Sequence, residues 1–168
     1  MKKLFLAGLL LSRLPALAQA TSAAETTQPA PVASGSALDT KNGFRTYLLG
    51  APISSYPQLK RTGKELYESP KESLLEGDVQ LTSLSFTSYK KRLASIVLGT
   101  LGTNNIEKLL ALFTREYGPS TSTNAVLQIF VCQLVMLYVT MVGSGGREVC
   151  IVTFKSNELA AAQKAAEK

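Results

Sequence analysis

NNIEKLLALFTREYGP, residues 104–119, is the best-specified helix in the sequence. Its apolar residues recur at steps of three and four, so most of them share one side of an α-helix. These residues are Ile106, Leu109, Leu110, Leu112, Phe113 and Tyr117. Asn104 or Asn105 can cap the first turn. Gly118 can close the last turn in a left-handed conformation, and Pro119 prevents continuation. A helix this short is marginal alone in water, so the sequence predicts that it packs on one face of a sheet.

Strand-like segments precede this helix. Residues 44–49 are predicted to form a first strand, and residues 53–56 a short helical turn. The segment 58–77 is polar and rich in turn residues, with Tyr67, Leu74 and Leu75 as its expected anchors to the core.

Two further segments are predicted to form a hairpin. Residues 79–86 alternate weakly between apolar and polar side chains, and residues 93–98 are apolar on both sides. The basic segment 89–92 lies between them and is typical of a hairpin connection.

The late apolar tract, residues 125–142, contains no charged side chain. Hydropathy alone permits a membrane-spanning helix of this length. β-Branched residues fill much of the tract and a polar break interrupts it, which favours two strands, 126–131 and 134–142. A third strand, 148–155, would follow a glycine-rich turn. The sequence therefore predicts an α+β fold: an antiparallel sheet of about six strands, formed by a hairpin and a C-terminal three-strand meander, with one main amphipathic helix packed on one face.

The first twenty residues have the pattern of a signal peptide. Lys2 and Lys3 supply the basic start, residues 4–11 the apolar run, and residues 18–20 a small-x-small cleavage site. The apolar run is too short to span a bilayer, which takes about 20 residues. No cysteine lies near the cleavage site, so we expect export to the periplasm or the exterior without a lipid anchor, and a mature chain that begins at Thr21.

The rest of the chain divides into three parts by composition. Residues 21–41 are rich in Ala, Thr, Ser and Pro, which predicts a disordered linker. Residues 42–159 have the length and apolar content of a single α+β domain, and residues 160–168, which weakly favour helix, are expected to form a frayed C-terminal tail. Loss of the signal peptide would reduce the formal net charge from +6 to +3, because three of the eighteen basic residues lie in it.

The residue types narrow the chemistry that the protein can perform. The chain has no histidine, which excludes Ser-His-Asp and Cys-His catalysis and removes the usual zinc ligands. Five carboxylates crowd one polar segment: Glu65, Glu68, Glu72, Glu76 and Asp78. Paired carboxylates can hydrolyse glycosidic bonds, although a solvated loop balanced by neighbouring basic residues has the same composition. We predict no catalytic residue, no cofactor, no metal ligand and no nucleic-acid partner.

The two cysteines are expected to stay unpaired. In the predicted meander Cys150 lies opposite about Thr140, and Cys132 lies roughly 25 Å further along the strands. A disulfide needs Cα atoms within about 7 Å. We therefore expect a buried Cys150 and, in the turn, a freer thiol at Cys132.

Several short motifs occur along the chain: Asn42-Gly43-Phe44-Arg45, LGAPISSYP at residues 49–57, GDVQL at 77–81, YKKRL at 89–93, Tyr117-Gly118-Pro119 and SNEL at 156–159. Taken together, these segments resemble a family of small, uncharacterised exported bacterial proteins. All of them are turn or strand signatures, so the resemblance implies an α+β domain and transfers no activity.

This chain departs from the family pattern in its last hairpin. The family usually has Trp near Phe130, Gly at the positions of Cys132 and Lys91, and more polar residues along the strand that here spans 134–141. The outer face of that hairpin is therefore more apolar than expected, so either a partner covers it or the protein is poorly soluble.

From these observations we expect an exported, non-enzymatic binding or interaction domain. A protein partner, or self-association, would use the apolar C-terminal hairpin. The alternatives are a carboxylate-dependent cell-wall hydrolase and a membrane-anchored protein with a span at residues 125–142.

Overall fold

The computed structural model describes residues 36–124, 126–145 and 147–168. Residues 1–20, the predicted signal peptide, and most of the predicted linker lie outside the described residues. The helices are α1 (Ala37–Lys41), the 3-10 helix η1 (Ile53–Ser55), α2 (Thr103–Tyr117) and α3 (Asn157–Ala166). The strands are β1 (Gly43–Phe44), β2 (Tyr47–Leu48), β3 (Lys60–Arg61), β4 (Leu66–Glu68), β5 (Leu75–Glu76), β6 (Val79–Tyr89), β7 (Arg92–Leu101), β8 (Ser122–Thr123), β9 (Leu127–Val131), β10 (Val135–Val142) and β11 (Val149–Ser156).

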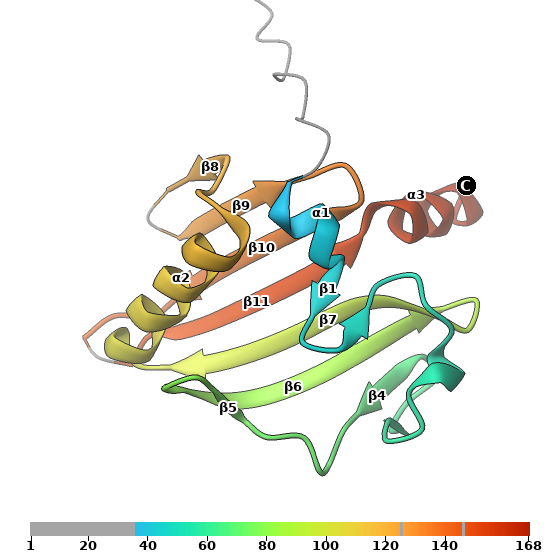
Figure 1. Ribbon diagram of the computed structural model, residues 1–168, viewed down its shortest axis with the longest axis horizontal. Coiled ribbons are helices and arrows are strands. Elements are labelled where there is room, and N and C mark those ends of the chain that lie inside the picture. The colour runs from blue at the N-terminus through green and yellow to red at the C-terminus, as the bar shows by residue number, and fades with distance from the viewer. Residues whose placement is uncertain (1–35, 125, 146) are drawn as a thin grey trace, which may run out of the picture. The chain divides into compact units, whose positions relative to one another are not determined.

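The described part of the chain forms an antiparallel sheet of nine strands, with the order β3-β4-β6-β7-β11-β10-β9-β8 and with β5 paired to β6. The strands β6, β7, β9, β10 and β11 are the long ones, and the other four have two or three residues each. Between β7 and β8 the chain runs through α2, after which β9, β10 and β11 lead back until β11 pairs with β7. Figure 1 shows α1 and α2 on one face of this sheet. The α+β class is confirmed.

The predicted hairpin and meander are also confirmed. Strands β6 and β7 join through Lys90 and Lys91, both with positive φ (49° and 62°), which suits a tight hairpin turn. The late apolar tract forms β9 and β10, followed by β11. Among the described residues, no helix has the length and apolar content needed to cross a membrane.

The prediction of one strand over residues 44–49 is wrong. The chain instead reverses at Arg45, whose φ is 54°, so that β1 and β2 form a small hairpin of their own. Phe44 and Tyr47 are both buried by this reversal. An uninterrupted strand would place these two side chains on opposite faces, because their positions differ by three.

Helix α2 packs as predicted but is capped differently. Ile106, Leu109 and Phe113 are its buried residues. The residue at the N-cap is Gly102, with no side-chain cap, and the side chain of Asn105 donates to the carbonyl of Leu101 instead. Burial of one apolar stripe, rather than a strong cap, therefore stabilises this helix.

Four aromatic rings join α2, β1 and β11 in the core. The ring centroid of Phe154 lies 5.6 Å from that of Phe44, 5.8 Å from that of Phe113 and 5.6 Å from that of Tyr117. Phe154 is fully buried, and its strand β11 lies between β7 and β10. This cluster attaches the helix and the β1–β2 hairpin to the middle of the sheet.

The ordered domain begins before residue 42, so the predicted linker boundary needs correction. Ser36 caps α1 by accepting the amide of Asp39, and Leu38 is fully buried. The Asp39 carboxylate accepts the backbone amides of Gln133 (2.8 Å), Leu134 (2.7 Å) and Val135 (3.3 Å) in the β9–β10 turn. A short helix that looks polar in sequence is thus held by one buried leucine and one carboxylate.

Replacing Asp39 by alanine is expected to lower the free energy of unfolding by about 2 kcal/mol, because backbone amides lose a charged acceptor. Urea denaturation followed by circular dichroism measures this change. Asp78→Ala is the control, since it removes an exposed carboxylate and should leave the midpoint unchanged. An Asp39→Ala midpoint equal to that of the control would contradict the anchoring role of Asp39.

The other end of the domain also differs from expectation. Residues 160–168, predicted as a tail, continue α3 as far as Ala166, with Ser156 as its N-cap. Leu74 and Leu75, predicted as anchors, are 37% and 53% exposed. Charged side chains close to these two leucines attach this loop to the rest of the domain instead.

Both cysteines are free and buried, so the prediction of a freer thiol at Cys132 is wrong. Cys150 lies opposite Met141 rather than Thr140, one residue away from the predicted register. Burial raises the pKa of the Cys150 thiol to about 11.

Candidate functional site

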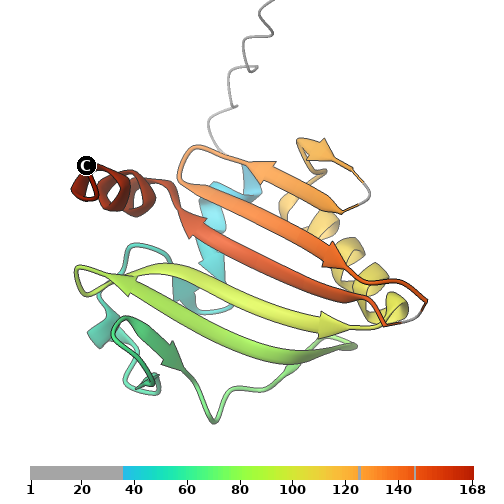
Figure 2. The same ribbon diagram turned by 180° about the vertical axis from the view of Figure 1, so that it is seen from behind.

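The sheet has a second face that none of the described elements covers. On β10 and β11, alternate residues are buried beneath α2 and the β1–β2 hairpin, and the others point away from them. The outward residues of β7, β9, β10 and β11 form a surface that we call the open face. Its members are Ser95, Val97, Gly99, Leu101, Leu127, Ile129, Val131, Met136, Tyr138, Thr140, Val142, Val149, Ile151, Thr153 and Lys155. Figure 2 shows these strands from behind, with α2 on the far side.

Cross-strand pairing makes the apolar part of the open face continuous. Val142 lies opposite Val149, which in turn lies opposite Leu101 on β7. These three side chains are 60%, 36% and 50% exposed, and the more central Ile151 is 44% exposed. Large apolar side chains on three adjacent strands, β7, β11 and β10, therefore meet solvent together, which is uncommon on a monomeric soluble protein.

The open face has a polar margin on one side. Its single charged member, Lys155, lies opposite Met136 and Ser95 near one end of the strands. The next strand, β6, presents Ser85 and Thr87 on the same side, because they pair with Val97 and Ser95. Protein interfaces commonly combine apolar side chains with a polar rim, and here the polar rim lies along the β6 side of the open face.

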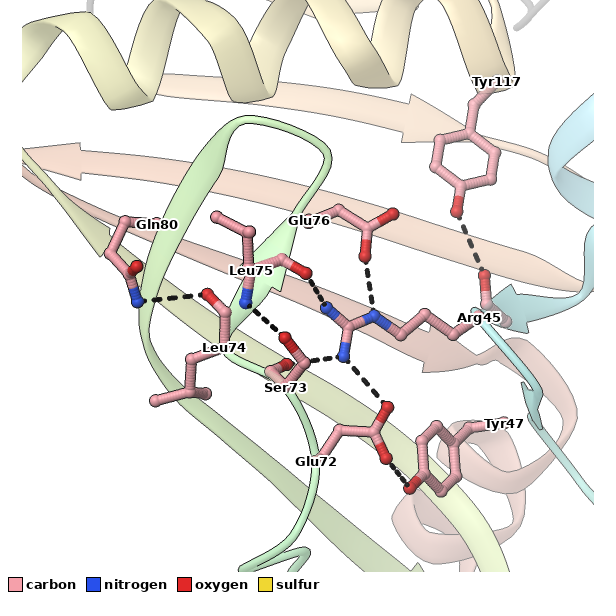
Figure 3. Close-up of polar contacts among 10 residues, drawn as sticks. Arg45, Tyr47, Glu72, Ser73, Leu74, Leu75, Glu76, Gln80 and Tyr117 are labelled. Carbon is pink, nitrogen blue, oxygen red and sulfur yellow. Dashed lines mark hydrogen bonds and ion pairs between the residues drawn. The ribbon is translucent and has the colours of Figure 1, made fainter.

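The carboxylates considered for hydrolysis lie elsewhere, and two of them converge on Arg45 (Figure 3). The Arg45 side chain is 15% exposed and donates to Glu76 (2.6 Å) and to Glu72 (3.0 Å). It also donates to the carbonyls of Ser73 (2.7 Å) and Leu75 (2.9 Å). One guanidinium thus attaches the loop before β6 to the β1–β2 hairpin. We call these five residues the Arg45 cluster.

The hydrogen bonds of this cluster continue to two further side chains. The hydroxyl of Tyr47 donates to the second carboxylate oxygen of Glu72 at 2.8 Å and accepts from Gln58 at 3.2 Å. Burial raises the pKa of Tyr47, although the bond from Gln58 opposes the shift. Both oxygens of Glu72 are therefore occupied, which favours a structural role over that of a free general base.

The remaining carboxylates of the segment do not join this pair. Asp78 is exposed and forms an ion pair with Lys108 at 3.1 Å, which lowers the pKa of Asp78. A carboxyl group with a lowered pKa stays ionised at neutral pH and donates no proton. Glu65 and Glu68 are exposed near β4.

A pocket of about 480 Å³ opens beside the Arg45 cluster, between the β1–β2 hairpin and the end of α2. Its charged walls are already paired: Arg45 with Glu76, and Lys41 with Glu116. The hydroxyl of Tyr117 donates to the carbonyl of Gly43 at 3.3 Å. In the described part of the chain, no group of three or more acidic or cysteine side chains could hold a metal ion.

The sequence predicted the exposed hairpin β10–β11. It did not predict that β7 contributes to the open face, or that Arg45 holds the loop before β6. Residues 93–98 are apolar on both sides, which was the only local sign that this strand has two apolar faces. Nothing in the sequence around Arg45 indicated that it would bind carboxylates about thirty residues later in the chain.

Comparison with protein-family models, curated proteins and solved structures finds no significant match to this chain.

Proposed function

We propose that this protein is an exported, non-enzymatic interaction domain that binds a protein surface through the open face. The observation that carries the proposal is the exposure of large apolar side chains side by side on β7, β11 and β10, with a further exposed apolar side chain, Val131, on β9. Burying one such side chain fully is worth about 1.5–3 kcal/mol, so covering even part of the face would release substantial free energy.

The chemistry of the open face favours a protein partner. Many of its side chains are β-branched, and these lose little conformational entropy when a partner immobilises them. The polar rim on β6 supplies hydroxyl groups that can form hydrogen bonds at the edge of an interface. Export is supported by the basic start, apolar run and cleavage site within residues 1–20.

Site-specific photo-crosslinking in the producing cells tests this proposal. Benzoylphenylalanine replaces Ile151 in the open face or, as the matched control, Leu48 on β2, which is 47% exposed on the opposite side of the sheet. We expect a discrete protein adduct from position 151 and none from position 48, because only the open face would be covered. Mass spectrometry then identifies the adduct.

Two outcomes would contradict the proposal. Absence of any protein adduct at position 151 would remove the open face as a binding surface. An intact Met1 terminus on the protein, with no product beginning at Thr21, would remove the export component.

A further inference from the structure

We propose that the partner of the open face is the open face of a second copy of this chain. This inference rests on the proposed function, because it requires that the open face binds protein. Two sheets would then pack face to face about 10 Å apart, as in a β-sandwich, with α2 on the outside of each copy.

The size of the open face suits such a dimer. Strands β10 and β11 have eight residues each. Four strands about 4.8 Å apart and about eight residues long, at about 3.4 Å per residue, cover about 500 Å² of sheet. Two copies together would bury about 1,000 Å², which is the area that a specific interface is expected to reach. Side chains that stand up from the sheet add to this area.

The charge distribution also favours self-association. A partner that is recognised by its charge needs charged groups on the open face to pair with. The open face offers only one, Lys155. Lys155 lies near one end of the strands, and Val142 and Val149 lie at the other. A two-fold axis across the strands, in the plane of the interface, would therefore place the two lysines at opposite margins. At these margins each ammonium group can reach water while the methylene groups of the same lysine stay in contact with the apolar interface.

The side chains of the open face also alternate in size. Tyr138 lies opposite the smaller Thr153, and Ile151 lies opposite the smaller Thr140. Two copies of such a surface can interdigitate as the inner faces of a β-sandwich do.

Analytical ultracentrifugation of the purified full chain over a range of concentrations tests the dimer. We expect the wild type to sediment at twice the monomer mass. Ile151→Lys should raise the dimer dissociation constant by at least about 30-fold, because it places a charge at the centre of the interface. Leu48→Lys introduces the same charge at a residue of nearly equal exposure, 47% against 44%, and should leave the constant unchanged.

Near-ultraviolet circular dichroism confirms that each variant is folded. Val142→Lys, at a residue that is 60% exposed, is a second variant that tests the open face if Ile151→Lys unfolds. A wild type that stays monomeric at every concentration overturns the inference. A dimer that neither open-face substitution weakens also overturns it, because its interface lies elsewhere.

The crosslinking experiment separates this inference from the proposed function. An adduct of two copies of the chain at position 151 supports both. An adduct with a different protein supports the proposed function and overturns self-association. No adduct at all, together with a monomeric wild type, overturns both.

Discussion

Replacing Phe154 by alanine is expected to lower the free energy of unfolding by about 4 kcal/mol, the largest effect of any single substitution considered for this protein. The side chain is fully buried, and its ring lies within 6 Å of three other aromatic rings, those of Phe44, Phe113 and Tyr117. Alanine would leave a cavity where β1, α2 and β11 meet. The loss combines the transfer of the ring to water with the contacts that its neighbours cannot replace.

Urea denaturation at one fixed protein concentration measures this loss, since self-association would make stability depend on concentration. Phe154→Leu is the graded control: it keeps much of the volume and should lose less than half as much free energy. A loss below about 1 kcal/mol for Phe154→Ala would contradict the central role of the aromatic cluster.

Replacing Arg45 by alanine is expected to cost about 3 kcal/mol, because Glu72 and Glu76 would lose their common counter-ion in a half-buried setting. Two backbone carbonyls, those of Ser73 and Leu75, would lose their donor as well. The loop before β6 should then become more mobile, which hydrogen exchange of residues 72–76 would detect as faster exchange.

The carboxylates themselves supply the control for this prediction. Adding Glu72→Gln and Glu76→Gln to the Arg45→Ala variant removes the uncompensated charges and should restore part of the lost stability. Arg115→Ala, which removes a 71% exposed guanidinium paired with Glu116, should leave stability unchanged. Equal stability of Arg45→Ala and Arg115→Ala would show that the Arg45 cluster contributes nothing beyond an exposed ion pair.

Local periodicity was enough to predict most of the regular structure. Residues 104–117 repeat apolar side chains at helical steps, and they form α2. The tract after them is rich in β-branched residues and has a polar break, and it forms strands rather than a spanning helix. These predictions succeeded because each depends on interactions between residues close together in the sequence.

Predictions that depended on distant contacts failed. Residues 36–41 look like linker, and only the buried pocket for Leu38 and the amides that bind Asp39 make them part of the domain. Residues 44–49 look like one strand, but burial of both Phe44 and Tyr47 requires the chain to reverse at Arg45. In both cases the stabilising partner lies in a part of the chain that no local pattern identifies.

The local sequence pattern was sufficient to define the main helix α2, the long strands and the apolar character of their faces. Only the tertiary structure decided that β11 pairs with β7, and therefore that Leu101 and Val97 extend the surface that begins on β10. Strands that are apolar on both sides do not specify which side is covered. Helix α2 covers one face of the sheet, so the path of the chain between β7 and β8 leaves the other face open.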